Sequence, residues 1–160
     1  MAEKIKTNVM RVLEQQNIPY TAHEYPHDKE AVDGVTVARL LGQDPDCVYK
    51  TLVARGKSGG CYVFCIPVAE ELDLKKAARA VKEKAIELVA VKELLGLTGY
   101  VRGGCSPVGM KKAFPTVFHE FAEILPTIMV SAGKIGYQIE CAPQDLLDLV
   151  GADTADLTVN

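Results

Sequence analysis

The segment Cys47-Val-Tyr-Lys-Thr-Leu-Val-Ala-Arg55, followed by Gly56-Lys-Ser-Gly-Gly60 and Cys61-Tyr-Val-Phe-Cys-Ile-Pro-Val68, decides how the chain can fold. Its two outer parts are rich in β-branched, aromatic and cysteine residues, which favour strands. The middle part holds three glycines in five residues and is typical of a turn. The sequence therefore predicts a β-hairpin over residues 47–68.

Helices and further strands alternate on both sides of this hairpin. The apolar spacing predicts helices over residues 5–17, 36–41, 72–91, 91–95 and 144–150, the last preceded by Pro143. Shorter apolar or alternating runs predict strands over residues 20–25, 116–118, 127–130 and 137–141. Residues 27–33 and 98–112 are expected to be loops, and residues 153–160 a polar tail. This order predicts a mixed α/β fold with a curved sheet and peripheral helices.

Length and composition indicate one ordinary globular domain over residues 1–160. Hydrophobic residues make up 48% of the chain and the mean hydropathy is +0.07, which excludes a disordered protein. The sequence has no run of 18 apolar residues and so predicts no membrane span. Its first residues do not resemble a secretion signal, so we expect a cytoplasmic protein. The net charge of −3 argues against binding to duplex DNA, although a local basic patch remains possible.

Five cysteines at irregular spacing, without a secretion signal, indicate reduced thiols rather than a disulfide framework. Cys61 and Cys65 form the closest pair. On a strand they would lie about 13 Å apart, too far for one zinc ion to bridge. The sequence therefore predicts neither a metal site nor a cofactor.

Lys50 is the first residue that packing alone does not require. It lies within Val48-Tyr-Lys-Thr-Leu-Val53 and shares a strand face with Val48 and Leu52. In a partly buried cleft, its ammonium group could donate to a carbonyl or phosphate oxygen. The alternative is an edge-strand lysine whose ammonium group extends into water.

A glycine-rich segment from Gly99 to Lys112 is the second candidate. Its four glycines within eleven residues let the backbone approach a ligand closely, and consecutive N–H groups can hold an anion or oxyanion. It matches neither the P-loop nor the dinucleotide-binding fingerprint. Arg102, Lys111 and Lys112 make it a candidate patch for a phosphate backbone. A flexible surface loop would have a similar composition.

The segment from Met129 to Tyr137, a strand, a glycine turn and a second strand, is the third candidate. An ordinary hairpin turn explains it equally well. A nucleophilic pair of Cys105 and His119 is also conceivable, but their spacing offers no support.

The three segments together are more specific than each one alone. The motifs Tyr49-Lys-Thr-Leu52, Gly99-Tyr-Val-x-Gly-Gly-x-Ser-Pro-x-Gly-x-Lys-Lys112 and Ser131-x-Gly-x-x-Gly136, with Ala142-Pro-Gln-Asp-Leu146, resemble the YbaK/EbsC family. These proteins are free-standing relatives of the prolyl-tRNA synthetase editing domain. The resemblance extends from about Val12 to about Asp153.

The resemblance implies a small sheet curled into a partial barrel, with helices around it. The implied activity is trans-editing, the removal of a wrong amino acid from a tRNA, with Cys-tRNA(Pro) as the substrate of the cysteine-specific members. Such a site restores the accuracy that a synthetase pocket cannot reach for similar amino acids. The implied partners are aminoacyl-tRNA, chiefly tRNA(Pro), and transiently prolyl-tRNA synthetase, without DNA, a membrane, a metal or a cofactor.

The resemblance also implies roles for individual residues. Lys50 would be the catalytic residue. The substrate-binding residues would be Tyr25, Thr51, Gly103, Gly104, Ser106, Pro107, Gly109, Ser131 and Gly133. Arg102, Lys111 and Lys112 would contact tRNA.

In the cysteine-specific members, the substrate's own thiol is thought to attack its ester carbonyl. Some relatives carry an acidic residue near Gln138. Here that position is glutamine, and Glu140, two residues on, faces the same side if the segment is a strand. Two other readings remain open: a deacylase for another small amino acid such as alanine, and a non-catalytic module that binds tRNA or a nucleotide.

Overall fold

The computed structural model describes residues 5–27 and 32–160. The helices in this part of the chain are α1 (Asn8–Gln15), α2 (Gly34–Leu41), α3 (Leu74–Ala80), α4 (Val91–Thr98) and α5 (Pro143–Val150), with 3-10 turns η1 (Pro45–Cys47) and η2 (Glu120–Ile124). The strands are β1 (Thr21–Glu24), β2 (Tyr49–Gly56), β3 (Cys61–Pro67), β4 (Ile86–Leu88), β5 (Thr116–His119), β6 (Ile128–Ser131), β7 (Tyr137–Cys141) and β8 (Asp153–Ala155). The predicted mixed α/β class is confirmed.

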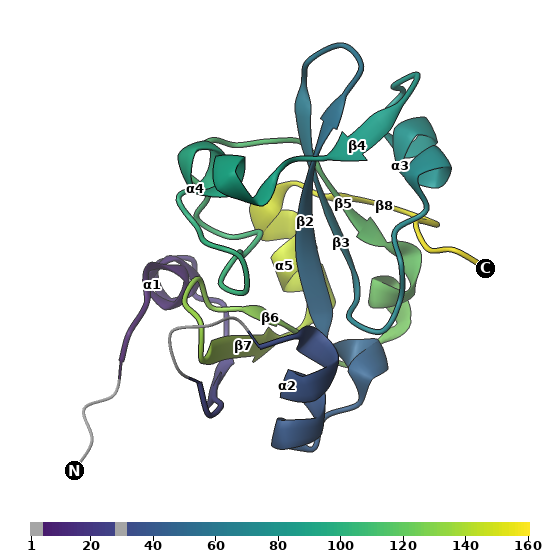
Figure 1. Ribbon diagram of the computed structural model, residues 1–160. Helices are drawn as coiled ribbons and strands as arrows, with labels where there is room; N and C mark the ends of the chain where they lie inside the picture. The colour runs from purple at the N-terminus through teal and green to yellow at the C-terminus, as the bar shows by residue number, and fades with distance from the viewer. Residues whose placement is uncertain (1–4, 28–31) are drawn as a thin grey trace.

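The hairpin of β2 and β3 is the centre of the molecule, as the sequence predicts (Figure 1). The two strands pair antiparallel, from Tyr49 opposite Pro67 to Arg55 opposite Cys61. Gly59 closes the turn with a φ of +96°, a value that side chains other than glycine rarely tolerate. Lys50 and Thr51 lie near the start of β2, at the end of the hairpin opposite the turn.

The strands form two sheets that meet at the base of β2. The larger sheet has the order β4-β2-β3-β5-β8, and its β3–β5 and β5–β8 pairs are parallel. The smaller sheet, β1-β7-β6, is antiparallel throughout. A bridge between Val48 and Met129 joins them. Figure 1 shows the smaller sheet crossing the lower end of the β2–β3 hairpin, so the strands curve around a shared core.

Buried side chains fill three regions around these sheets. The largest lies between the two sheets and contains Phe118 and Ile139, with Leu13 of α1 and Leu146 of α5 packed against them. A second region lies under α3 on the opposite face of the larger sheet. The third, which includes Ala38 and Met129, holds α2 against the smaller sheet. Burial of such apolar surface is the main contribution to the stability of the fold.

The helix predicted over residues 72–91 is wrong in its second half. The helix α3 ends at Ala80, and Lys82 takes a left-handed φ of 60°. The chain then forms β4, which pairs with β2 so that Ile86 lies opposite Gly56. The apolar spacing continued beyond the helix because Ile86 is buried as part of a strand, against the core under α3.

The polar tail predicted over residues 153–160 is also wrong. Residues 153–155 form β8, a parallel neighbour of β5, and the side chain of Leu157 is fully buried. Thr158 bridges to Leu72. In the predicted loop over residues 27–33, positions 28–31 lie outside the described residues. No helix in the described ranges is long and apolar enough to span a membrane.

Candidate functional site

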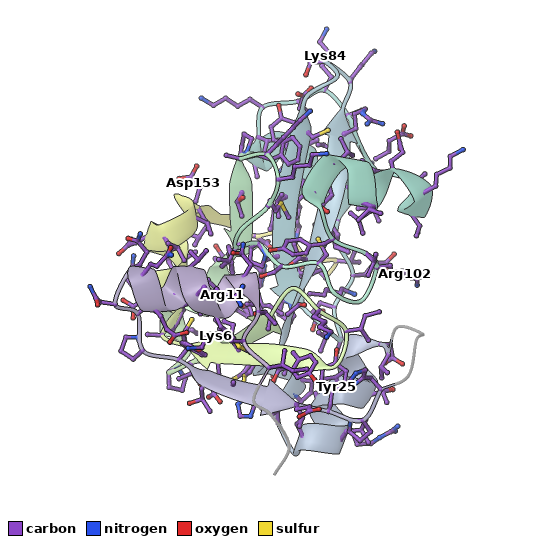
Figure 2. All side chains as sticks on the ribbon, turned by 90° about the vertical axis from the view of Figure 1, so that its left-hand side faces the viewer. Lys6, Arg11, Tyr25, Lys84, Arg102 and Asp153 are labelled. Atoms are coloured by element: carbon purple, nitrogen blue, oxygen red, sulfur yellow. The ribbon has the colours of Figure 1, made fainter. Side chains whose placement is uncertain are left out.

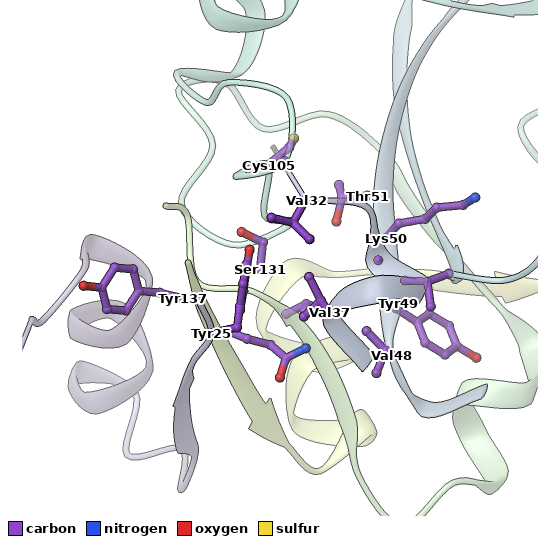
Figure 3. A pocket seen from close by; sticks show the side chains of 15 residues that line it. Tyr25, Val32, Val37, Val48, Tyr49, Lys50, Thr51, Cys105, Ser131 and Tyr137 are labelled. Carbon is purple, nitrogen blue, oxygen red and sulfur yellow. The ribbon is translucent and has the colours of Figure 1, made fainter. Parts of the chain in front are cut away.

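A pocket lies where the base of β2, the start of α2, the glycine-rich loop and the β6–β7 hairpin meet (Figure 3). Its volume is about 130 Å³. Pockets for drug-sized ligands are several hundred Å³, so this one suits a smaller chemical group. The lining residues are Tyr25, Val32, Gly34, Val37, Val48, Tyr49, Lys50, Thr51, Val68, Gly103, Cys105, Val130, Ser131, Tyr137 and Gln138.

Five residues that the resemblance implicates line this pocket, although they come from distant parts of the sequence. They are Tyr25, Lys50, Thr51, Gly103 and Ser131. The fold brings them together because β1 pairs with β7 and β6 lies beside β2.

Other implicated residues lie behind this lining and shape it. The Ser106 hydroxyl is buried and accepts a hydrogen bond from the Val108 amide at 3.3 Å. Pro107, Gly109 and Lys112 line a separate cavity of about 230 Å³ beside α1 and α5. The structure therefore places these residues in the support of the glycine-rich loop.

The glycine-rich loop packs closely on its neighbours. Gly103 has a φ of +86°, which turns the chain toward the pocket. At Gly104, a Cβ atom would lie 3.2 Å from the backbone nitrogen of Ile135, so the two backbones nearly touch. The Tyr100 hydroxyl donates to the carbonyl oxygen of Val108 and ties the two sides of the loop together. Glycine is required here by close approach as well as by backbone conformation.

Lys50 is half-buried at the edge of the pocket. Burial lowers the pKa of its ammonium group, while the carboxylates of Glu71 and Glu70 act in the opposite direction. In Figure 3 the ammonium group is directed away from Ser131 and Cys105. The charge therefore lies at the rim of the cavity, within electrostatic reach of two acidic residues.

Tyr25 and Ser131 present hydroxyl groups to the cavity. Tyr25 is only 5% exposed and, like Ser131, lines the pocket (Figure 3). The Ser131 oxygen accepts from the Gly133 amide at 3.1 Å, which leaves its own O–H group free to donate. This bond also gives Gly133 a structural role in the turn after β6.

Cys105 is the cysteine in the described lining of the pocket. It lines the pocket but is 8% exposed, and burial raises its pKa to about 12. A thiol in that state is almost entirely protonated at neutral pH and is a poor nucleophile. His119 is not part of the pocket lining, and its Nδ1 accepts from the Leu157 amide at 3.2 Å. The structure thus gives the conceivable Cys105–His119 pair no support.

Gln138, not Glu140, faces the pocket. Glu140 lies outside the lining, where it is bonded to Thr127 at 2.6 Å and to His23 at 2.8 Å. The hydrogen bond from Thr127 and then that from His23 lower the pKa of Glu140. Gln138 is buried and accepts from the Nε2 of Gln43 at 2.7 Å. No pattern in the sequence pointed to Gln43, because this contact joins residues 95 positions apart.

The three cations expected to contact tRNA are exposed at the start and end of the same loop. Arg102 lies on the side of the molecule that Figure 2 presents, and Lys111 and Lys112 are likewise exposed. In the described parts of the chain, no group of three histidine, cysteine, aspartate or glutamate residues could hold a metal ion.

Comparison with known proteins gives the family. The sequence model of the aminoacyl-tRNA editing domain matches residues 28–149. An Enterococcus faecalis protein named as a Cys-tRNA(Pro)/Cys-tRNA(Cys) deacylase, EbsC, is 45% identical over 153 residues, which cover 96% of this chain and 93% of that protein.

Solved structures share the fold. One described as a trans-editing enzyme for prolyl-tRNA synthetase has a TM-score of 0.81 at 28% identity, with 95% of each chain covered. The hypothetical protein APE2540 has a TM-score of 0.84 at 22% identity, covering 94% of this chain and 99% of that one, which shows the shared fold. Together with the domain match over more than half of the chain, these relatives confirm the predicted resemblance: the chain belongs to the aminoacyl-tRNA editing domain family.

Proposed function

We propose that this chain is a trans-editing deacylase that removes cysteine from mischarged Cys-tRNA(Pro). The observation that carries the proposal is the small pocket, about 130 Å³, whose described lining offers hydroxyl and amide donors together with Lys50. Neither a carboxylate nor an imidazole is part of that lining, and its thiol is protonated. A pocket of this kind can hold an aminoacyl ester but supplies no strong base or nucleophile of its own.

The substrate would then supply the nucleophile. The sulfur of the cysteinyl group forms a bond to its own ester carbonyl carbon, and the bond from that carbon to the ribose oxygen breaks. The thiol proton ends on the ribose oxygen, so the products are a cyclic thiolactone and a tRNA with a free terminal hydroxyl. The thiol and the carbonyl belong to the same cysteinyl group, so the step is intramolecular. Holding the thiol against the carbonyl selects the reactive conformation, which is a source of rate acceleration.

Within this proposal, the protein positions the ester and stabilises charge. Lys50 at the rim would contact the terminal adenosine or its phosphate, and amides of the loop at Gly103 would donate to the carbonyl oxygen. Tyr25, Thr51 and Ser131 would line the space for the aminoacyl group. Each of these roles agrees with the placement of the side chain in the pocket.

An ester assay tests the proposal. The chain is incubated with Cys-tRNA(Pro), Ala-tRNA(Pro) and Ser-tRNA(Pro), and loss of each ester is followed over time. We expect rapid loss of the cysteinyl ester and much slower loss of the seryl ester, because a hydroxyl is a far poorer nucleophile than a thiol. Equal loss of the alanyl ester would instead favour a deacylase for small amino acids. Binding without loss of any ester would favour a non-catalytic module.

We further propose that selection of tRNA(Pro) requires prolyl-tRNA synthetase. The chain is acidic overall and offers only local cations, which favours weak contact with the tRNA body. The relative named for both Cys-tRNA(Pro) and Cys-tRNA(Cys) agrees with low discrimination by the isolated protein. Adding the synthetase should increase the preference for Cys-tRNA(Pro), and an unchanged preference would contradict this proposal. The activity would be exerted in the cytoplasm, where tRNA is charged.

A further inference from the structure

The side chains of Gln43 and Gln138 form an amide pair at the wall of the pocket. Gln138 lies on β7, is 3% exposed and lines the cavity. Its Oε1 accepts a hydrogen bond of 2.7 Å from Nε2 of Gln43. In the arrangement that the structure shows, the Gln138 oxygen is directed at Gln43, which leaves the Nε2 group of Gln138 for a second partner.

The end of α2 brings Gln43 to this position. Gly42 ends the helix with a left-handed φ of 65°, and the amide of Gln43 returns to the carbonyl oxygen of Ala38 at 2.8 Å. The Oε1 of Gln43 is buried and has no hydrogen-bond partner among the described residues. Its bond to Gln138 is therefore the polar contact that this side chain makes in the described part of the chain.

The other end of the Gln138 amide is available to a ligand. Its Nε2 donates to none of the residues that the structure describes, and the small exposed part of Gln138 opens on the cavity. An acceptor in the cavity would therefore meet a donor that makes no hydrogen bond to the described residues. The pair thus presents a donor to whatever occupies the pocket.

Neighbouring side chains present donors to the same space. Ser131 lies directly opposite Gln138 in the register of β6 and β7, and its O–H group donates to none of the described residues. The Tyr25 side chain lines the same pocket (Figure 3). A set of donors matches a carbonyl oxygen, and matches it better once that oxygen gains negative charge during ester cleavage.

We propose that Gln138 donates from Nε2 to the carbonyl oxygen of the aminoacyl ester, and that Gln43 is a positioning residue that fixes this orientation. The assignment rests on the proposed deacylase function. In this assignment, the Gln138 side chain contacts the reacting group. Gln43 lies outside the pocket lining and affects the reaction only through Gln138.

Opposite charges at position 43 test the orientation. Glutamate can only accept, so Gln43→Glu should turn the Gln138 amide and point its oxygen into the pocket. Lysine can only donate, so Gln43→Lys should keep the original orientation. We expect Gln43→Glu and Gln138→Met to lower kcat for Cys-tRNA(Pro) roughly 100-fold, the size of effect seen when an oxyanion donor is lost. Gln43→Lys should stay close to the wild-type rate.

A double variant separates positioning from a general effect on the fold. In the Gln138→Met background, Gln43→Glu should cause no further loss, because the group on which it acts is gone. Gln144→Glu is the matched control for the charge change: Gln144 is exposed on α5 and bonded to Asp148. It should leave kcat unchanged. If Gln43→Glu does not fold, Gln43→Met takes its place, with a smaller loss of about tenfold expected because the Gln138 amide becomes free to rotate.

Equal rates for Gln43→Glu and Gln43→Lys, or a Gln43→Glu loss that persists in the Gln138→Met background, would overturn the assignment. The same variants are also titrated with a stable analogue, cysteine joined by an amide to 3′-amino-adenosine. If the wild-type chain leaves Cys-tRNA(Pro) intact, the proposed function fails, and the analogue decides the assignment separately. Weaker binding by Gln43→Glu than by Gln43→Lys would still support it. Equal affinities, or no binding by the wild type, would refute it.

Discussion

The backbone of Gly104 lies against the backbone of Ile135, so that a Cβ atom at position 104 would be 3.2 Å from the Ile135 nitrogen. This contact sets the distance between the glycine-rich loop and the β6–β7 hairpin, the two walls that carry Gly103 and Ser131. The atoms nearest to this Cβ position belong to the backbone of Ile135 and Lys134, not to a flexible side chain. An added methyl group must therefore move one wall of the pocket.

Gly104→Ala should therefore lower deacylation of Cys-tRNA(Pro) by about tenfold or more, because small misplacements of reacting groups are costly. The matched control is Gly96→Ala, in the exposed part of α4, where nothing lies within 4 Å of the added atom. That change should keep activity and raise the stability of the chain by up to about 1 kcal/mol, because alanine is a better helix former. Initial rates and thermal melts compare the two variants, and full activity of Gly104→Ala would contradict the expected displacement.

Lys50→Ala should lower the rate of deacylation by at least ~100-fold if the ammonium group orients the reacting ester. Because burial lowers the pKa of Lys50, the activity that depends on its charge should be lost, as the pH rises, at a lower pH than for an ordinary lysine. Lys75→Ala, at an exposed position on α3, is the control. A Lys50→Ala variant with the wild-type rate would remove this residue from the mechanism.

Cys105→Ala should keep most of the activity, because the thiol with a pKa of about 12 is protonated at neutral pH and the substrate supplies the nucleophile. For the same reason, the rate should not follow titration of this thiol between pH 7 and about pH 9. Single-turnover rates of both proteins over that range measure the effect. Complete inactivity of a folded Cys105→Ala variant would rule out cleavage by the substrate's own thiol.

Arg102→Ala should weaken tRNA binding and reduce the slope of log affinity against log salt concentration by about 1, the effect of losing one phosphate contact. Arg79→Ala, an exposed position on α3, should leave the slope unchanged. Filter binding at several salt concentrations compares them. Identical slopes for wild type and Arg102→Ala would place the tRNA backbone elsewhere on the surface.

The hydrogen bond from Thr127 lowers the pKa of Glu140 more than the hydrogen bond from His23 does, and Thr127→Val removes it. A carboxyl group whose pKa is lowered by folding stabilises the protein above its ordinary pKa, and this contribution is lost as the pH falls through the lowered value. Thr127→Val should thus unfold at lower urea concentration than wild type at pH 7, and the difference should shrink in acid. If the loss of stability in Thr127→Val stays the same at every pH, altered packing would be its cause instead of the hydrogen bond. Deacylation should be unaffected, since neither residue lines the pocket.

Local sequence pattern predicted those parts of the fold that depend on neighbours along the chain. The hairpin of β2 and β3 follows from its residue types and from the glycines between them. By contrast, Ile86 and Leu157 are buried by pairing of β4 with β2 and of β8 with β5, contacts between distant segments that local periodicity cannot reveal.

The candidate site shows the same division. The residues around Lys50 were unusual for packing alone, and the resemblance of the combined motifs added Ser131. Both positions line the pocket. Gln43 follows an ordinary helix-ending glycine, and its partner on β7 is far away in sequence. Only the fold reveals that its side chain reaches the pocket wall.

The pairing of β1 with β7 has a consequence for synthesis of the protein. The partner of Thr21 is Glu140, which the ribosome adds more than one hundred residues later. At about 5–20 residues per second, the nascent β1 segment stays without its partner for roughly 6–24 seconds. An unpaired apolar strand would be prone to aggregation during that time. Thr21, Ala22 and Glu24 stay exposed even in the folded protein, so this segment offers little apolar surface while it awaits its partner.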